Sequence, residues 1–117
     1  MEKDSGGKLA SLPPAKINFS AKVTQIATGL QHTLLLTIHG EVYAFGSNNY
    51  GQLGLLDLNP RGIPTPVDLT PRGLNASKAI SVACGSYHSV ILLDNGQVLT
   101  FGKFFYWYYQ LLNVAFC

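Results

Sequence analysis

The residues in this sequence that are best suited to chemistry are two histidines, His32 and His88, because imidazole carries protons near neutral pH and is a common metal ligand. They lie 56 residues apart, each at the same place in one of two similar stretches. A catalytic or metal-binding group is rarely duplicated in every unit of a repeat. We therefore expect both rings to face inward and to bond the backbone of the nearby glycine turns, whereas His39 is expected in solvent at the tip of a turn.

The other reactive side chains show no arrangement that suits an active site. The carboxylates fall at expected turns and strand ends, and we expect solvent to surround Glu41, Asp57, Asp68 and Asp94. Cys84 has Ala and Gly as neighbours and is expected to be a small buried side chain rather than a nucleophile. The Gly-Gln-Leu-Gly segment at 51–54 lacks the Lys and the Ser or Thr of a phosphate-binding loop. The sequence predicts no catalytic residue, no cofactor and no metal site.

An internal repeat must position these residues. Residues 26–46 and 82–102 align without a gap and share eight identities in 21 positions. A repeat of this length is typical of propellers and solenoids, whose units bury their faces against one another. The signature residues of the repeat, which we expect to have structural roles, are Gly29, His32, Gly40, Phe45, Gly46, Gly51, Gly54, Gly85, His88, Gly96, Phe101 and Gly102.

The apolar periodicity predicts short antiparallel strands and no helix. The strands of the first copy are expected at 22–27, 32–38, 41–45 and around 65–69, and the third strand of the second copy at 97–101. The second strand of the first copy is almost continuously apolar, which suits burial on both faces. Four such strands per repeat are what a propeller blade requires.

Turn-forming residues fix how these strands connect. The pairs His39-Gly40 and Asn95-Gly96 are expected to form two-residue hairpin turns, with Asn-Gly favouring type I′. Pro64 and Pro66 predict that the fourth strand is an outer one, where a missing N–H donor does no harm.

The expected fold is therefore all-β, with one complete four-stranded propeller-type blade and part of a second. Residues 1–20 form a flexible lead-in, 21–72 the first blade, 73–103 the incomplete second blade and 104–117 an aromatic tail. The tail is shorter than the about twenty residues that span a bilayer. It is interpreted as a non-native or alternatively spliced end, with an interfacial anchor and a makeshift edge strand as the alternatives.

The first copy carries the spaced pattern Ile26-Ala27-x-Gly29, His32-Thr33, Gly40-x-Val42-Tyr43-x-Phe45-Gly46 and Asn48-x-x-Gly51-Gln52-Leu53-Gly54. The second copy matches this pattern as far as Phe101-Gly102. The pattern resembles the repeat of the regulator of chromosome condensation family, which implies a fragment of a seven-bladed propeller. Within that family, residues 29–33 and 59–66 resemble the propeller region of giant ubiquitin ligases of the Highwire type.

One departure from the family pattern lies just after the Gly-Gln-Leu-Gly segment. The chain reads Leu55-Leu56-Asp57 where the family usually has Leu-Gly-Asp. Leu56 therefore occupies a position where Gly would permit positive φ, which predicts a changed loop or local strain.

The composition indicates which kinds of partner the chain can bind. Charged residues make up 12% of the chain, against about 25% in a typical soluble domain, while 47% are hydrophobic. Some apolar surface is therefore expected to be covered by neighbours, and the isolated chain is expected to self-associate. The net charge is +2 and the basic residues are scattered singly, so no nucleic-acid footprint is visible. The N-terminal residues do not resemble a secretory signal, which places the chain in the cytoplasm or nucleus rather than outside the cell.

The resemblance implies a non-catalytic protein-binding or scaffold segment, with a ubiquitin ligase as the parent protein. The alternative is a fragment of a guanine nucleotide exchange factor for a Ran-like small GTPase. The two interpretations differ in the partner, which is an unidentified protein in the first and a small GTPase in the second. Neither predicts a cofactor, direct nucleic-acid binding or a membrane span.

Overall fold

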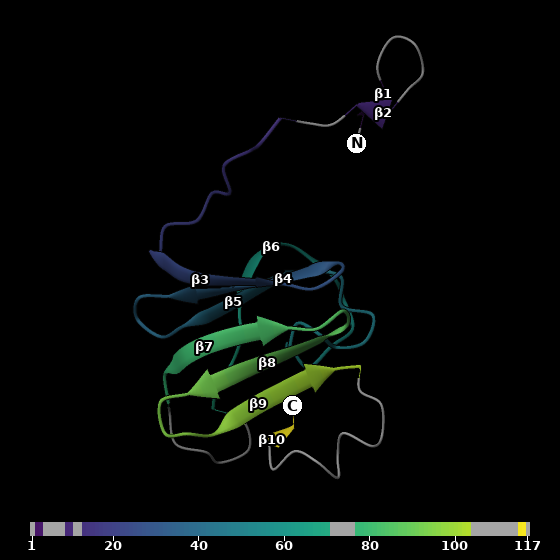
Figure 1. Cartoon of the computed structure of the whole chain (residues 1–117). Coiled ribbons are helices and arrows are strands. Elements are labelled where there is room, and N and C mark those ends of the chain that lie inside the picture. The colour runs from purple at the N-terminus through teal and green to yellow at the C-terminus, as the bar shows by residue number, and fades with distance from the viewer. Residues whose placement is uncertain (1, 4–8, 11–12, 71–76, 104–114, 117) are drawn as a thin grey trace.

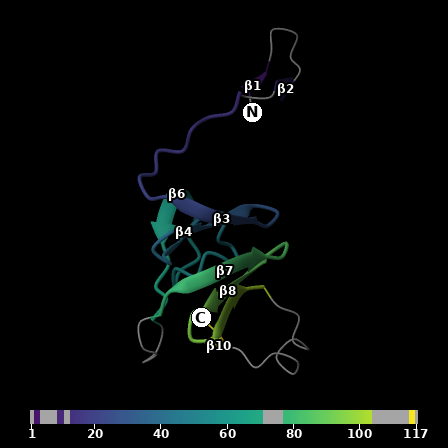
Figure 2. The same ribbon diagram turned by 60° about the vertical axis from the view of Figure 1, so that its left-hand side comes forward.

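The computed structural model describes residues 2–3, 9–10, 13–70, 77–103 and 115–116. All regular structure in these residues is β-strand, which confirms the expected all-β class. Two four-stranded sheets lie one above the other, as Figure 1 and the turned view of Figure 2 show. A short antiparallel pair, β1 (Glu2–Lys3) and β2 (Leu9–Ala10), precedes them.

The first sheet contains four antiparallel strands in chain order. They are β3 (Val23–Thr28), β4 (His32–Thr37), β5 (Val42–Gly46) and β6 (Arg61–Pro66). Five of the six residues of β4 are buried, as the apolar run predicted. The strand β6 forms one edge, which suits its two prolines.

The position of the fourth strand differs from the prediction of 65–69. Pairing begins at Arg61, which lies opposite Gly46, and ends at Pro66 opposite Tyr43. Val67 and Leu69 follow the strand and are instead buried in the core, with 7% and 8% of their surfaces exposed. These two buried apolar residues are two positions apart, which is the spacing that a strand with one buried face would also show.

The second sheet repeats the first with three antiparallel strands. They are β7 (Ala79–Cys84), β8 (His88–Leu93) and β9 (Val98–Gly102). The two-residue strand β10 (Ala115–Phe116) pairs with β9 in parallel, opposite Leu99 and Thr100. This pairing agrees with the edge-strand alternative for the end of the tail, whereas residues 104–114 and 117 lie outside the described residues.

The two hairpin turns are longer than expected. The amide of Gly96 donates to the carbonyl of Leu93 (3.0 Å), and the amide of Leu93 donates to the carbonyl of Gln97 (2.8 Å). Gly96 has φ of +87°, but Asn95 is not among the residues with positive φ. This is a three-residue hairpin in which a type I turn is followed by a left-handed glycine, so the prediction of type I′ was wrong. The first sheet has the same turn, because the amide of Gly40 donates to the carbonyl of Thr37 (3.0 Å) and the amide of Thr37 donates to the carbonyl of Glu41 (2.9 Å).

The core lies between the two sheets. The first sheet contributes Leu34, Leu36, Val42 and Ala44, and the second contributes Ile91, Leu93, Leu99 and Phe101. Each of these side chains is at most 3% exposed. Backbone bonds also join the sheets at both ends, because the amide of Leu30 donates to Ser86 (3.1 Å) and that of Ala79 to Gly40 (2.9 Å). The sheets therefore pack as two neighbouring blades.

The far side of the first sheet is covered in part by the segment before β3. The ring of Phe19 packs edge-on against Tyr43, with centroids 4.7 Å apart and planes at 78°. Phe19 is half-buried, unlike residues 13–18, which are exposed. The expected lead-in at 1–20 thus includes one side chain that packs on the blade.

Candidate functional site

The first histidine of the repeat joins the two blades. His32 begins β4 and is 3% exposed. Its Nε2 lies 2.9 Å from the hydroxyl of Ser89 in β8. That hydroxyl donates to the carbonyl of Gln52 (2.7 Å), which lies in the loop between β5 and β6. We expected the ring to bond a glycine turn, but the structure places its Nε2 against a side chain of the next blade.

Counting donors fixes the protonation of this ring. The single hydroxyl hydrogen of Ser89 is used by Gln52, so Nε2 of His32 must carry the hydrogen that joins His32 to Ser89. Nδ1 then has only a lone pair, and it is buried with no partner among the residues that the structure describes. Burial lowers the pKa of His32, although the nearby backbone of His88 acts in the opposite direction. The neutral ring is the form that fits this site.

Both histidine rings lie against a signature glycine. A Cβ built on Gly29 would lie 2.2 Å from Cε1 of His32, and one built on Gly85 would lie 2.0 Å from Cε1 of His88. The amides of the two glycines donate to the carbonyls of the same histidines, at 2.8 and 2.9 Å. The same packing therefore occurs in both blades: the missing side chain of the glycine leaves space that the imidazole ring fills.

We expect the stability of the full chain to fall as the pH drops below about 6.5, and His32 to account for much of the loss. The unfolded chain has the ordinary histidine pKa and binds a proton more readily than the folded chain, so protonation favours unfolding. One such proton gives a slope of at most about 1.4 kcal/mol per pH unit. Urea titrations at several pH values measure it.

The matched variants for this prediction are His32→Gln and His39→Gln. His39 is exposed at a turn, so its replacement should leave the pH dependence intact. His32→Gln should flatten it. An unchanged slope in His32→Gln would show that the buried ring does not control the acid sensitivity.

The Gly-Gln-Leu-Gly segment is the second contact between blades. Leu53 is fully buried in the core shared by both sheets. A Cβ on Gly54 would lie 2.9 Å from the ring of Phe101 in β9, so the loop of the first blade rests directly on the second. Gln52 is 1% exposed, and its side-chain oxygen accepts the amide of Tyr50 (2.9 Å). The segment 51–54 therefore joins the two blades, and we call it the clasp.

The side chain of Asn48 forms hydrogen bonds across the loop between β5 and β6. This side chain is fully buried, and Oδ1 accepts the amide of Leu53 (3.0 Å). Nδ2 donates to the carbonyl and the carboxylate of Asp57, at 2.9 and 3.1 Å, and to the carbonyl of Asn59 (3.0 Å). One amide therefore ties both ends of the loop together.

Asp57 corrects the expectation that all four carboxylates are solvated. Its carboxylate forms an ion pair with Arg61 at 2.7 Å and accepts the amide of Asn59. The hydrogen bond from Arg61 is the largest of several effects that lower the pKa of Asp57. Glu41, Asp68 and Asp94 are exposed, as expected.

Leu56 adopts the strained conformation that the departure from the family pattern predicted. It has φ of 62° and is the one non-glycine residue with positive φ in the described part of the chain. It is also 89% exposed. A left-handed conformation costs a residue with a Cβ about 1–2 kcal/mol. Because the side chain of Leu56 is exposed, burial within the chain does not offset this cost.

We expect Leu56→Gly to stabilise the full chain by about 0.5–1 kcal/mol, because relief of the left-handed strain exceeds the about 0.4–1 kcal/mol that glycine adds to the unfolded entropy. Leu58→Gly is the matched control, since Leu58 is exposed but does not have positive φ. It should be destabilising. If both variants lost stability equally in urea titrations, Leu56 would not be strained.

The surroundings of Cys84 do not favour a reactive thiol. Cys84 is half-buried, and burial raises the pKa of its thiol, which disfavours a nucleophile. In the described part of the chain, no three metal-binding side chains gather and no helix is long and apolar enough to cross a membrane.

Sequence reasoning missed the roles of three residues that bond in or to the clasp: Asn48, Gln52 and Ser89. A signal was present for Ser89, because Thr33 occupies the same place in the first copy and also follows the histidine. A hydroxyl repeated at that place is what a histidine from a preceding blade would require. Asn48 and Gln52 belonged to the spaced pattern, but their bonding partners are not visible in it.

Comparison with known proteins agrees with this geometry. Two models of the regulator of chromosome condensation (RCC1) repeat match the chain, one at residues 39–92 and the other at 23–52 and 79–106. Human WBSCR16 superposes with a TM-score of 0.64 and 30% identity over 75% of this chain and 21% of its own. Yeast RCC1 (Prp20), in its complex with Kap60, superposes with a TM-score of 0.58 and 26% identity over 79% of this chain and 21% of its own.

Curated relatives include ubiquitin ligases. The ligase MYCBP2 of Danio rerio is 38% identical over 105 residues, which cover 88% of this chain and 2% of the ligase. The ligase highwire of Drosophila melanogaster is 48% identical over 64 residues, which cover 53% of this chain and 1% of the ligase. The chain thus spans a very small part of these relatives. From the matched repeats and the paired blades, the chain belongs to the regulator of chromosome condensation repeat family.

Proposed function

We propose that this chain is a non-catalytic segment that binds protein partners within the propeller of a large ubiquitin ligase of the Highwire type. The main support is the 38% identity to MYCBP2 of Danio rerio over 88% of the chain. The buried polar side chains that could have formed a reactive site support it as well. His32, Asn48, Gln52 and Ser89 all bond within or between the blades. The cytoplasm or the nucleus is the proposed compartment.

A matched pair of variants tests protein binding. Partners would be cross-linked to the full chain in cells and their binding repeated with purified proteins. The Asn49→Asp variant, changed at an exposed residue, should still bind a specific partner. The Asn48→Asp variant should not bind it, because this substitution disrupts the clasp. The proposal is contradicted if no partner survives purification, or if every partner binds both variants equally.

The second candidate is a fragment of a guanine nucleotide exchange factor. The observation that favours it is the likeness to yeast Prp20p, 27% identical at a TM-score of 0.57, whose structure is reported with its binding to Gsp1p and histones. We expect the full chain to give no acceleration of nucleotide release from a Ran-like GTPase, since it matches only 22% of Prp20p. Release at catalytic concentrations would favour the exchange-factor fragment instead.

A further inference from the structure

We propose that one surface of the chain binds an extended segment of a partner protein in which an acidic side chain lies next to an apolar one. This loop surface comprises Tyr50, Leu56, Leu58, Tyr87 and Lys103. The inference rests on the proposed protein-binding function and gives it a place and a chemistry.

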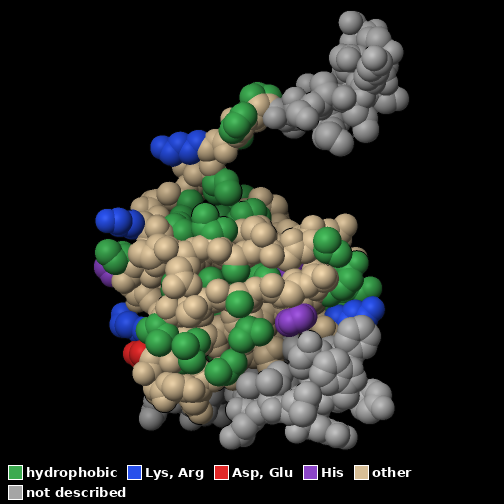
Figure 3. All heavy atoms as spheres, in the orientation of Figure 1, with side chains coloured by type: hydrophobic (Ala, Val, Ile, Leu, Met, Phe, Trp, Pro, Cys, Tyr) green, Lys and Arg blue, Asp and Glu red, His purple; other side chains and the backbone are tan. Residues whose placement is uncertain are grey.

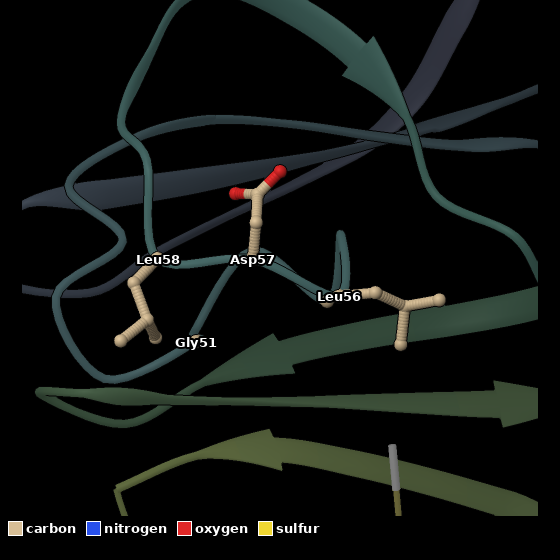
Figure 4. A pocket seen from close by; sticks show the side chains of 5 residues that line it. Gly51, Leu56, Asp57 and Leu58 are labelled. Atoms are coloured by element: carbon tan, nitrogen blue, oxygen red, sulfur yellow. The ribbon is translucent and has the colours of Figure 1, made fainter.

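The apolar half of the loop surface surrounds a small cavity. Leu56 is 89% and Leu58 is 63% exposed, and they line a cavity of about 240 Å³ together with Gly51, Gly54 and Asp57. Figure 4 shows the two leucines on opposite sides of Asp57, with Leu58 beside Gly51. The cavity is smaller than the about 300–1,000 Å³ of pockets for small-molecule ligands. Its size and apolar rim suit a side chain of a protein partner better than a cofactor.

The other half of the loop surface is aromatic and cationic. Nζ of Lys103 lies 4.8 Å from the ring centroid of Tyr50 and 5.8 Å from that of Tyr87. The two rings pack edge-on, with centroids 5.2 Å apart, although they come from different blades. Lys103 is exposed, and it has no ion pair among the described residues.

The charge balance of the loop surface is positive. Asp57 is the carboxylate that lines the cavity, and it is already paired with Arg61 at 2.7 Å. Figure 4 shows its carboxylate directed away from both leucines. Among the residues that the structure describes, the charge at this surface without an ionic partner is therefore the ammonium of Lys103, and an acidic side chain is its complement.

The two halves are continuous. Gly51 follows Tyr50 in the chain and lines the cavity, and a Cβ built on Gly51 would lie 3.9 Å from Cδ2 of Leu58. Figure 3 shows apolar side chains beside a cationic one at the right-hand edge of the molecule, where Figure 1 places the loops of the first blade and the end of β9. A partner side chain in the cavity would leave its neighbour within reach of the ammonium.

The strain at Leu56 also points to recognition. A leucine held in the left-handed region and left in solvent gains nothing from this chain, whereas a partner that covers it would bury a large apolar side chain. Strained backbone is found preferentially at binding sites, where the surrounding loop holds it in place. Here the buried amide of Asn48 provides that support.

The test is selection of peptides of about twelve random residues, displayed on phage, against the immobilised full chain. We expect the selected peptides to place Asp or Glu beside Leu, Phe or Met. Synthetic copies should bind the variants Leu56→Asp and Lys103→Glu about tenfold or more weakly than the unmodified chain. Asp is tolerated in the left-handed region, so Leu56→Asp should fold.

Two substitutions of exposed residues elsewhere serve as controls, Ile63→Asp and Lys22→Glu. They should leave peptide affinity within about twofold, which separates a local effect from a general change of charge. If the selected peptides bound all four variants alike, the loop surface would not be the site, but the proposed protein-binding function would stand. If the selected peptides were basic, or if no peptide were selected, the inference would be overturned. The proposed protein-binding function would then be tested separately, by partner capture with the Asn48→Asp and Asn49→Asp variants.

Discussion

Asn48→Asp should destabilise the full chain by about 3–5 kcal/mol, one of the largest losses that a single change of one atom can cause in this structure. The substitution keeps the shape of the side chain but replaces its NH₂ group by an oxygen. That group faces the carbonyl and the carboxylate of Asp57 and the carbonyl of Asn59, all within 3.1 Å. The new oxygen would then face three acceptors and no donor, while the other oxygen would still accept the amide of Leu53.

The loss should begin locally, in the loop between β5 and β6. Asn48 ties that loop to Leu53, which is fully buried between the blades, so opening the loop also withdraws the clasp from the second sheet. Urea titration measures the loss of stability, and hydrogen exchange of peptides spanning 48–61 locates it. The loss should be smaller near pH 4 than at pH 7, because the fold disfavours ionisation of the introduced carboxyl.

Asn49→Asp provides the control for this experiment. Asn49 is adjacent and exposed, so the same change of chemistry there should alter stability by no more than about 0.5 kcal/mol. Similar losses in the two variants would mean that Asn48 neither organises the loop nor holds the clasp against the second sheet.

The sequence predicted those parts of the structure that depend on local pattern. Strands β4 and β8 are apolar runs that begin at a repeated histidine, and both begin where the repeat places them. The strain at Leu56 was also predictable, because a position that requires positive φ is recognisable when a side chain replaces the usual glycine.

The parts that could not be predicted depend on which distant residues meet. The bond from His32 to Ser89 joins residues 57 apart. A hydroxyl residue follows each histidine, but the sequence alone does not show that the imidazole of one blade bonds the hydroxyl of the next. The Asn95-Gly96 pair is compatible with two hairpin lengths. Pairing of Leu92 with Val98 in the sheet selects the longer one, in which only the glycine needs positive φ.

Gly102→Ala should be the second large loss, because its backbone conformation and its surroundings both exclude a side chain. Gly102 has φ of +110°, and an added Cβ would lie 2.4 Å from the carbonyl oxygen of Tyr87 and 2.8 Å from Cα of His88. The atoms in the way belong to the backbone, so no side chain can rotate to make room. Strain of about 1–2 kcal/mol and overpacking of about 1–3 kcal/mol, less about 0.4–1 kcal/mol for the lower entropy of the unfolded alanine variant, give an expected loss of about 1–4 kcal/mol.

Gly96→Ala separates these two causes within the same blade. Gly96 has φ of +87°, but an added Cβ would meet nothing within 4 Å, so only the conformational strain remains. Its expected loss is about 1 kcal/mol, after allowance for the lower entropy of the unfolded alanine variant. Urea titrations of the two variants should thus differ by about 1–3 kcal/mol, which is the contribution of the close approach between β9 and the backbone before β8. Because Gly46 makes the same approach to Gln31 in the first blade, equal losses in Gly96→Ala and Gly102→Ala would remove the steric reason for glycine at this place in both copies of the repeat.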